Sequence, residues 1–396
     1  MIRRVAILGG GPAGSFAAAQ LASAGLAVQL FDEKLAWEKP CGGGLTFKAY
    51  HQYPFLLHNG TPKRLVTETT LGAAGAGQAR LKLHDPLVIY SRLDLNGMLL
   101  DRAERAGVQI ERARVLEMSR AGSGWRLRTG AGTAEADYCI VATGARNSLR
   151  DFGTQLHPRD TMAALGYYVD GDQENIDIEF LDGLEGYVWV FPRCGHLSVG
   201  ICGKGVNALE LRKRLEFYMN ERGIPLAGAR FYSHLLPSLD KGSWRHNRVA
   251  GDGWMAVGDA AGLVDPITGE GIYYAMRSGD LAAQVLLAES SAADPAAQYR
   301  RLLRRDFATD LEFGSRLAQR VFLGRFLCAP LPRRMVEFTR HSPRFAAVME
   351  DLFAGRQPYT GLKRRLLSNL NGSLYEIGMN LGFSRVVPWR LSQPRL

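Results

Sequence analysis

Residues 5–32 carry the feature that most constrains how this chain folds. A short apolar run, suited to a buried parallel strand, leads into Gly9, Gly11 and Gly14, which satisfy the pattern G-x-G-x-x-G. Gly9 permits a tight turn, Gly11 lets backbone N–H groups approach a pyrophosphate, and Gly14 lets the following helix pack closely. A second strand ends at Asp32, whose carboxylate can accept hydrogen bonds from an adenosine ribose. This order predicts a dinucleotide site rather than a glycine-rich turn in an unrelated helix–strand unit.

Chain length and cysteine content narrow the class of protein. At about 150 residues per domain, a chain of 396 residues is long enough for two to three domains or lobes. No apolar run approaches the roughly 20 residues that span a bilayer. The first strand begins so early that we expect no signal peptide and a cytoplasmic location. The five cysteines include no C-x-x-C pair and no metal-type Cys/His spacing, so we expect neither a disulfide framework nor a metal site.

Positive charge is concentrated at one end of the chain. The formal net charge is +10, and residues 297–396 hold 18 Lys and Arg against 7 Asp and Glu. The pattern there is amphipathic and helical, and prolines cut it into short pieces. Such a surface is either a solvated helical face or a contact for an anionic membrane, a phosphorylated substrate or an acidic ferredoxin. No nucleic-acid-binding motif accompanies it, so we expect no nucleic-acid partner.

Two further features could approach the dinucleotide. Residues 39–44 read KPCGGG, and three consecutive glycines favour a loop whose backbone passes close to a ligand. Cys41 beside this loop is either a redox-active or proton-donating thiol or a small residue that fills a gap. Arg92 begins an amphipathic helical pattern, where it can pair with a phosphate or a flavin edge or form a surface salt bridge.

Two later stretches are typical of the edge of a nucleotide-binding sheet. Residues 142–144 follow an apolar strand, and their glycine lets the backbone pass close to the dinucleotide. A second buried strand ends at Gly258 and Asp259, and a glycine-rich turn over 266–271 then leads into a helix. The N-terminus of that helix can stabilise negative charge on the N1–C2=O edge of a reduced flavin. Asp259 either holds a ribityl or ribose hydroxyl or serves as an N-cap.

Residues 160–245 have a different character. They read as successive strands separated by Gly, Asp and Pro turns, with one helical stretch between them, which predicts an antiparallel sheet above a substrate pocket. Tyr187 and Trp189, two apart on one strand, point to the same face, and Phe191 joins them. That aromatic face suits an apolar substrate, although such faces are also common in protein cores.

Together these stretches resemble the geranylgeranyl reductase family, within the larger group of FAD-dependent oxidoreductases that share the para-hydroxybenzoate hydroxylase fold. GGGPAG followed by Asp32 resembles the FAD-binding fingerprint of that group. VGDAAGLVDPITGEGI, over 257–272, resembles the motif that surrounds the ribityl chain and the isoalloxazine. ATGARNSLR, over 142–150, resembles the second nucleotide motif, with Thr143 where the family usually has aspartate.

Two other motifs resemble those of the reductases in particular. They are KPCGGG over 39–44 and YVWVFP over 187–192, the second of which lines the substrate cavity in that family. The G-x-G that follows in the family is replaced by GICG over 200–203, which is one residue longer. The resemblance covers about residues 1–290.

The resemblance implies an α/β fold with a Rossmann-type FAD-binding domain, a second, mainly antiparallel β substrate domain and a helical C-terminal region. We expect a discontinuous FAD-binding domain over 1–60, 90–155 and 246–296, a substrate-binding sheet domain over 61–89 and 156–245, and a basic helical region over 297–396.

The motifs also assign roles to residues. The residues expected to bind FAD are Gly9, Gly11, Pro12, Ala13, Gly14, Asp32, Glu33, Cys41, Gly42, Gly43, Arg92, Ala142, Thr143, Gly144, Gly258, Asp259, Pro266, Gly269, Glu270, Gly271 and Ile272. The residues expected to contact substrate are Tyr187, Trp189, Phe191 and Pro192, and the catalytic candidates are Cys41 and Tyr187.

The implied activity is reduction of carbon–carbon double bonds in an isoprenoid or another apolar, lipid-like molecule. Reduced FAD would deliver hydride from N5, and Tyr187, Cys41 or a bound water would supply the proton. The alternative is a flavin-dependent monooxygenase or halogenase, although the W-x-W-x-I-P signature of tryptophan-type halogenases is absent. A flavin-binding protein without turnover fits the same motifs. NAD(P)H, ferredoxin or a quinone pool can be the electron donor, and the chain has no second G-x-G-x-x-G.

Overall fold

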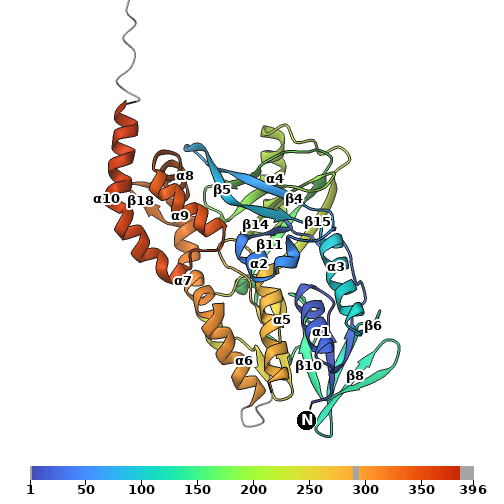
Figure 1. Cartoon of the computed structure of the whole chain (residues 1–396). Helices are drawn as coiled ribbons and strands as arrows, with labels where there is room; N and C mark the ends of the chain where they lie inside the picture. The colour runs from blue at the N-terminus through green and yellow to red at the C-terminus, as the bar shows by residue number, and fades with distance from the viewer. Residues whose placement is uncertain (1, 289–293, 384–396) are drawn as a thin grey trace, which may run out of the picture.

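The computed structural model describes residues 2–288 and 294–383, so the expectations for residues 1, 289–293 and 384–396 lie outside the described part. Figure 1 shows an α/β part at the bottom, a β-rich part above it, and a column of helices along the left side. The two large sheets each collect strands from separated stretches of the chain. The expected fold class is confirmed: a Rossmann-type part, a mainly antiparallel second sheet and a helical C-terminal region.

The lower part is built on a six-stranded sheet with the order β16-β17-β10-β1-β2-β6. Its strands are β1 (Arg4–Leu8), β2 (Ala27–Phe31), β6 (Gln109–Glu111), β10 (Tyr138–Val141), β16 (Ala250–Gly251) and β17 (Trp254–Ala256). β1 pairs in parallel with both β2 and β10, and β10 pairs in parallel with β17. The carboxyl ends of these strands therefore meet at one edge, where the loops after β1, β10 and β17 converge.

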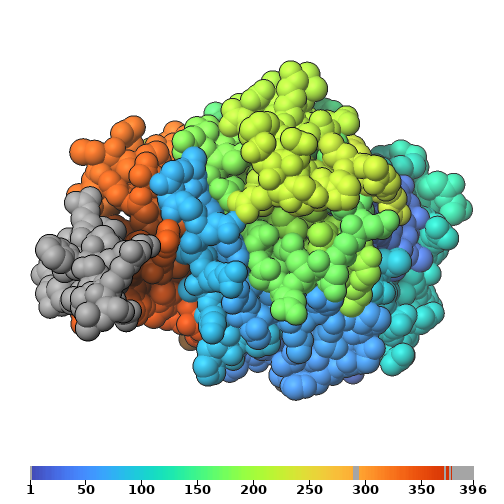
Figure 2. All heavy atoms as spheres, turned by 90° about the horizontal axis from the view of Figure 1, so that it is seen from above, coloured from blue at the N-terminus to red at the C-terminus, as the bar shows by residue number. Residues whose placement is uncertain are grey.

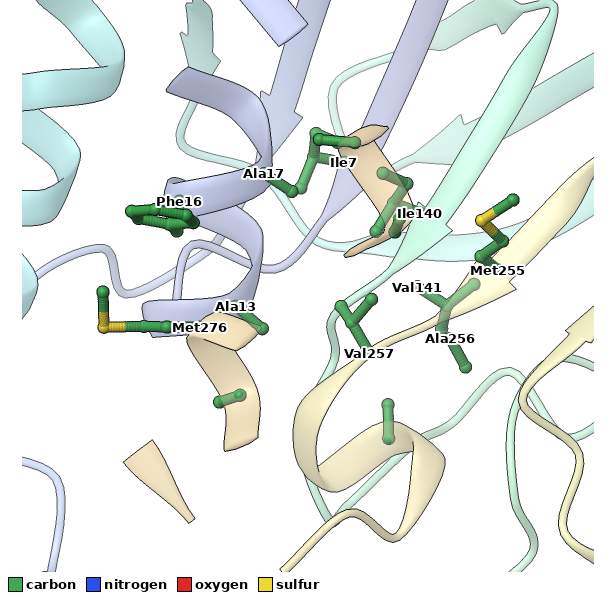
Figure 3. Packing of buried hydrophobic residues seen from close by; sticks show 14 of the residues in the cluster. Ile7, Ala13, Phe16, Ala17, Ile140, Val141, Met255, Ala256, Val257 and Met276 are labelled. Atoms are coloured by element: carbon green, nitrogen blue, oxygen red, sulfur yellow. The ribbon is translucent and has the colours of Figure 1, made fainter. Parts of the chain in front are cut away.

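Three helices pack on one face of this sheet: α1 (Pro12–Ser23), α3 (Arg92–Arg105) and α5 (Ile272–Leu287). α1 contacts both α3 and α5, and Figure 3 shows Ala17 of α1 facing Ile7 of β1, with Phe16 on the opposite side of the helix, on the same side as Met276 of α5. A Cβ on Gly279 of α5 would lie 2.4 Å from the carbonyl oxygen of Ala13, so the two helices meet backbone to backbone. This close packing holds the N-terminus of α5 beside that of α1.

A small antiparallel sheet adds to the same core. It consists of β7 (Val115–Ala121), β8 (Gly124–Thr129) and β9 (Thr133–Ala136), and it contributes Trp125 and Leu127 to the apolar cluster around β1 and β10.

The upper part is an eight-stranded sheet with the order β15-β11-β14-β13-β12-β4-β5-β3. Its strands are β3 (Gly44–Leu45), β4 (Arg64–Ala73), β5 (Gly77–Ile89), β11 (Thr161–Val169), β12 (Ile176–Phe180), β13 (Glu185–Pro192), β14 (Leu197–Lys204) and β15 (Arg230–Pro237). β4 and β12 pair in parallel, and the other neighbours pair antiparallel. Helix α4 (Ala208–Glu221) packs with Val188 and Val190 of β13, so the alternate residues of that strand face the opposite side.

The edge strand of this sheet comes from the range expected for the FAD-binding domain. Gly44 and Leu45 pair with Ile89 and Val88 of β5, and helix α2 (Phe47–Gln52) follows directly. The KPCGGG loop is consequently tethered to the upper sheet at its C-terminal end.

The C-terminal region consists mainly of helices that pack on the rest of the molecule. Its elements are α6 (Pro295–Leu303), a π-helical turn (Arg304–Ala308), α7 (Thr309–Leu323), β18 (Arg325–Phe326), β19 (Ala329–Pro330), α8 (Leu331–His341), α9 (Pro343–Phe353) and α10 (Tyr359–Phe383). α7 contacts β13, and α8 and α9 contact β5. Figure 2 shows the orange C-terminal region lying against the blue β4–β5 strands. Across the described ranges, no helix has both the length and the apolar character to cross a bilayer.

Candidate functional site

A cavity of about 510 Å³ lies where the lower sheet, the upper sheet and the C-terminal helices meet. The expected site residues that line it are Gly11, Pro12, Ala13, Cys41, Gly42, Gly43, Arg92, Ala142, Gly144, Tyr187, Trp189, Phe191, Gly258, Asp259, Gly269, Glu270, Gly271 and Ile272. The expected site residues outside its lining are Gly9, Gly14, Asp32, Glu33, Thr143, Pro192 and Pro266. The fold thus brings stretches that are far apart in the chain to one cavity.

The turn between β1 and α1 is shaped by glycines that play different parts. Gly9 has a φ of +119°, which favours glycine, and a Cβ there would lie 2.3 Å from the carbonyl oxygen of Ala142. A Cβ on Gly14 would lie 1.9 Å from the carbonyl oxygen of Gly9, so α1 approaches the turn closely only because residue 14 is glycine. A Cβ on Gly11 would meet nothing within 4 Å. Gly9 and Gly14 therefore act through packing, whereas Gly11 leaves room at the cavity wall.

Two helix N-termini open on the cavity without side-chain caps. α1 begins after Gly11 and α5 begins after Gly271, and neither N-cap residue has a side chain that accepts a backbone N–H. The N–H groups of each first turn are therefore available to a ligand, and the helix dipoles favour negative charge there. These two ends suit the pyrophosphate and the reduced flavin edge that the sequence predicts.

Asp32 stabilises the glycine turn from beside the cavity. Its Oδ2 accepts a hydrogen bond from Gly10 N at 2.7 Å, and its Oδ1 accepts from Lys34 N and Leu35 N at 2.8 Å each. A carboxylate oxygen has more than one lone pair, so a ribose hydroxyl can still donate to this group. Glu33 is exposed, and its Oε1 lies 3.7 Å from Nη1 of Arg114.

Two other expected residues have local structural partners. Thr143 Oγ1 donates to Asn147 Oδ1 at 2.9 Å and so shapes the loop after β10. Pro192 is buried at the end of β13, where the alternation of a strand turns it away from the face of Phe191.

The glycine-rich turn before α5 is held by Asp265. Its Oδ1 accepts hydrogen bonds from Ile267 N and Thr268 N at 2.9 Å each. Pro266 is buried and points toward α7, where a Cβ on Gly314 would lie 3.3 Å from the proline ring. Pro266 therefore anchors the turn to the C-terminal region, and the following glycines form the cavity wall.

Unpaired polar atoms in the cavity wall indicate that a ligand belongs there. Arg92 Nε, Trp189 Nε1 and His234 Nε2 are buried without a hydrogen-bond partner among the described residues, and all three side chains line the cavity. Buried polar groups are normally paired because leaving them unpaired costs free energy. The backbone room at Gly11, the two open helix ends and the unpaired atoms of Arg92 and His234 together fit an extended FAD molecule.

Asp259 is the centre of a charged group next to the helix α5 entrance. Its Oδ2 lies 3.2 Å from Lys39 Nζ. Burial raises the pKa of Asp259, but the charge and hydrogen bond of Lys39 and the charge of Arg92 act in the opposite direction, and the pKa lies below its usual value overall. Burial, together with Lys39, lowers the pKa of His234 to about 3, so this histidine is neutral near pH 7. Asp259 does not cap α5, whose N-cap is Gly271, and its ionised carboxylate can accept a hydrogen bond from a hydroxyl.

The sequence did not predict a buried ion pair that lies behind the KPCGGG loop. The Arg193 side chain is fully buried and donates from Nη1 to Glu38 Oε1 at 2.8 Å, from Nε to Gly42 O at 3.1 Å, and from Nη2 to Cys41 O. A Cβ on Gly43 would lie 3.1 Å from Cζ of the same guanidinium. Arg193 therefore sets the path of the loop. No local pattern marks it, because its partners are more than 150 residues away in the chain.

Glu38 extends this network to Arg92. Its carboxylate accepts from the Ser91 hydroxyl and from the backbone N–H groups of Arg92 and Leu93, so it caps the start of α3. Burial raises the pKa of Glu38, but Arg193 and these hydrogen bonds outweigh burial and lower it overall. The two cavity residues Cys41 and Arg92 are thus positioned by one shared carboxylate.

The aromatic residues of β13 form one wall of the cavity, as their alternation predicts. Tyr187, Trp189 and Phe191 all line it. A Cβ on Gly200 of the neighbouring strand would lie 2.3 Å from Cζ2 of Trp189, so the first glycine of GICG leaves the space that the indole needs. The Tyr187 hydroxyl donates to the carbonyl of Thr268 in the turn before α5.

The C-terminal region supplies another wall that was missed from the sequence. Leu352, Phe353, Pro358 and Tyr359 line the cavity, and Tyr359 Oη donates to both carboxylate oxygens of Asp265 at 2.9 Å. No short motif could have shown this, because these apolar residues have no spacing that differs from an ordinary helical core. A π-helical turn, of the kind often found at functional sites, places Phe307 in the same wall.

Comparison with known proteins identifies relatives over most of the chain, although no family model matches it. Menaquinone reductase of Mycobacterium tuberculosis is 31% identical over 362 residues, which cover 82% of this chain and 85% of the relative. Geranylgeranyl diphosphate reductase of Synechocystis is 29% identical over 329 residues, which cover 74% of this chain and 77% of the relative.

Solved structures share the fold. A geranylgeranyl bacteriochlorophyll reductase-like protein of Thermoplasma acidophilum superposes with a TM-score of 0.76 at 21% identity, covering 93% of this chain and 100% of that one. The flavin-dependent brominase Bmp2 superposes with a TM-score of 0.68 at 16% identity, covering 93% and 99%. With the relatives, the FAD-binding motifs and the cavity geometry in agreement, the chain belongs to the geranylgeranyl reductase family of FAD-dependent oxidoreductases.

Proposed function

We propose that this FAD-dependent oxidoreductase reduces carbon–carbon double bonds of an isoprenoid or a similar lipid-like molecule. The observation that carries the proposal is the continuity of the cavity: the glycine cradle, the aromatic face of β13 and the apolar C-terminal wall line one space. The names of the relatives support it, because geranylgeranyl diphosphate and menaquinone both carry isoprenoid chains.

The residues of this chain would act mainly by binding and orientation. Trp189 and Phe191 offer an apolar face, and Leu352 and Phe353 face the same space from the C-terminal side. Together they would bind an apolar chain and exclude water from the reacting bond. FAD, once bound and reduced, supplies a hydride from N5 to one carbon of the double bond. A proton must then reach the other carbon.

Cys41 and Tyr187 are the proposed sources of that proton, directly or through a water. Cys41 Sγ accepts a hydrogen bond from Gly43 N at 3.3 Å, and Cys41 lines the cavity. The Tyr187 proton is engaged with the carbonyl of Thr268, and burial raises the pKa of Tyr187 well above its ordinary value. We therefore favour Cys41 as the donor, and expect Cys41→Ala to lower the rate of alkene reduction about 100-fold. Tyr187→Phe should lower it less than tenfold.

The alternative is an oxygen-dependent monooxygenase or halogenase reaction. The shared fold with the flavin-dependent brominase supports this second candidate at the level of fold alone. It requires a reaction between reduced flavin and dioxygen, whereas alkene reduction does not. NAD(P)H and ferredoxin are the proposed electron donors, and the basic C-terminal region suits docking of an acidic ferredoxin.

One experiment separates the two reactions. Protein reduced with dithionite under anaerobic conditions is mixed with a panel of isoprenoid alcohols, isoprenoid diphosphates and menaquinones. Reoxidation of the flavin absorbance, with a product that gains two hydrogens per bond by mass spectrometry, is expected without oxygen. Product formation that requires oxygen would contradict the proposal that the protein is a reductase. Repeating the reduction step with NADPH or reduced ferredoxin in place of dithionite identifies the donor.

A further inference from the structure

A short hairpin between α7 and α8 presents an apolar tip to solvent. β18 and β19 pair through Arg325 with Pro330 and Phe326 with Ala329. Leu323 is 43% exposed, Phe326 37% and Leu327 53%, so three large apolar side chains are exposed within residues 323–327. Single exposed apolar side chains are normal on a protein surface, but a cluster of this kind points to a contact. Figure 1 places β18 on the side formed by the C-terminal helices.

The tip is held in one conformation by arginine side chains. Leu327 and Cys328 both adopt left-handed backbone conformations, with φ of +47° and +61°, which cost free energy in residues other than glycine. Arg325 Nη2 donates to the carbonyl of Cys328 at 2.8 Å, and Arg334 Nη2 donates to the carbonyl of Leu327 at 2.6 Å. The carbonyl groups of the turn are therefore satisfied from within, while its apolar side chains point outward.

The surroundings of the tip are positively charged. Arg316 pairs with Glu312, and Arg334 pairs with Glu337. Arg320 and Arg325 form no ion pair within the described part of the chain, and Arg320 lies one helical turn before Leu323. The apolar cluster thus has unpaired cations beside it, which suits a surface that is apolar inside and anionic at its boundary.

Helix α4 also exposes large apolar side chains, but it does not combine them with unpaired arginines as the tip does. Leu209 and Phe217 are 65% and 68% exposed, more than any of the three large apolar side chains of the tip. Their arginine neighbours are neutralised, because Arg212 pairs with Glu216 and Arg214 pairs with Glu210. Lys213 is the one cation between them that forms no ion pair among the described residues, against two such cations at the tip. This helix therefore provides a matched control.

We propose that the hairpin tip, residues 323–328, inserts Leu323, Phe326 and Leu327 into the interfacial layer of an anionic lipid membrane, with Arg320 and Arg325 on the lipid phosphates. The same helical region forms a wall of the cavity through Leu352 and Phe353. Docking through the tip would bring that wall close to the source of a lipid-like substrate. The inference does not depend on the proposed reaction, because membrane binding can be measured without turnover.

Co-sedimentation of the full chain with lipid vesicles tests the proposal. We expect binding to vesicles that contain phosphatidylglycerol and much weaker binding to pure phosphatidylcholine vesicles. Leu323→Ser with Leu327→Ser should weaken binding about tenfold or more, and Arg320→Gln with Arg325→Gln about 30-fold. Leu209→Ser with Phe217→Ser should leave it unchanged. Circular dichroism verifies that each variant is folded. Equal binding by the tip variants and the wild type would overturn the proposal, as would no binding by the wild type.

Cys328 offers a direct reporter, because it is an exposed free thiol within the tip. In a Cys194→Ser variant, an environment-sensitive fluorophore on Cys328, with its position verified by peptide mass, should shift to the blue on phosphatidylglycerol vesicles. Quenchers attached to the lipid should reduce its emission. The matched label on Cys194 in a Cys328→Ser variant should not respond. A shift that follows protein concentration without vesicles would mean that a second copy of the chain covers the tip, and would contradict the membrane proposal.

Discussion

The two ends of the cavity are built by different means. At the end with the glycine turn, the wall is backbone: Gly11 leaves room, and two helices present unpaired N–H groups. At the other end the wall is made of side chains from β13 and from the C-terminal helices. A backbone wall accepts almost no substitution, whereas a side-chain wall can change its shape while the fold stays the same. Substitutions at the two ends of the cavity are therefore expected to have separable effects.

The largest loss of stability is expected at Arg193, where the two ends of the cavity are joined. Arg193 follows the aromatic strand and holds the carbonyls of Cys41 and Gly42. Arg193→Met leaves the half-buried Glu38 without its cation and the carbonyls of Cys41 and Gly42 without their donor, and it should lower the free energy of unfolding by about 3 kcal/mol, with loss of flavin binding. Urea unfolding and the flavin content of the purified protein measure this. Glu38→Gln combined with Arg193→Met should cost less than Arg193→Met alone, because no unpaired charge remains. An equal loss of stability in Arg193→Met and in the double variant would mean that packing, and not the charge pair, stabilises the contact between the two ends of the cavity.

Gly14→Ala, a change in the backbone wall, is expected to cause a smaller loss of stability and a complete loss of FAD binding. Gly14→Ala places a Cβ 1.9 Å from the carbonyl oxygen of Gly9, so α1 must shift, at a cost of about 1–3 kcal/mol. Gly11→Ala is the matched control, because its Cβ meets nothing within 4 Å in the protein. It should keep the wild-type Tm and still bind FAD at least tenfold more weakly. Thermal unfolding and flavin titration distinguish the two. If Gly11→Ala binds FAD normally, Gly11 is not part of the cofactor wall.

In the side-chain wall the expected effect is on substrate and not on cofactor. Trp189→Phe keeps an aromatic ring but removes part of the apolar face, so KM for an isoprenoid substrate should rise about tenfold with kcat little changed. Flavin content should match the wild type. Steady-state kinetics together with flavin absorbance provide the measurement. Loss of flavin from Trp189→Phe would show that the side-chain wall of the cavity also contributes to cofactor binding.

The smallest effect is a dependence of stability on pH. The pKa of Glu38 is lower in the folded protein, so its contribution is present above the unfolded value of about 4.3 and is lost as the pH falls through the folded value. Glu38→Gln should remove this acid-side loss of stability. Urea unfolding at a series of acidic pH values measures it. An unchanged pH profile in Glu38→Gln would assign the acid sensitivity to other carboxylates.

The sequence by itself determined the parts of the molecule that depend on neighbouring residues. The turn at Gly9 and Gly14, the uncapped start of α5 and the shared face of Tyr187 and Trp189 follow from local backbone geometry and strand alternation, which short motifs encode. The assignment to the FAD-dependent reductase family rested on the same motifs and is confirmed by the relatives.

Only the tertiary structure decided which distant side chains complete the cavity. Arg193 meets Glu38, and Tyr359 meets Asp265, because the chain crosses between two sheets and returns through the C-terminal helices. The tertiary structure also turns Pro266 toward α7, and it places Asp32 where its carboxylate accepts a hydrogen bond from the backbone of the glycine turn. Contacts of this kind depend on topology and packing, and neither Arg193 nor Tyr359 has a local pattern that differs from an ordinary core or surface position.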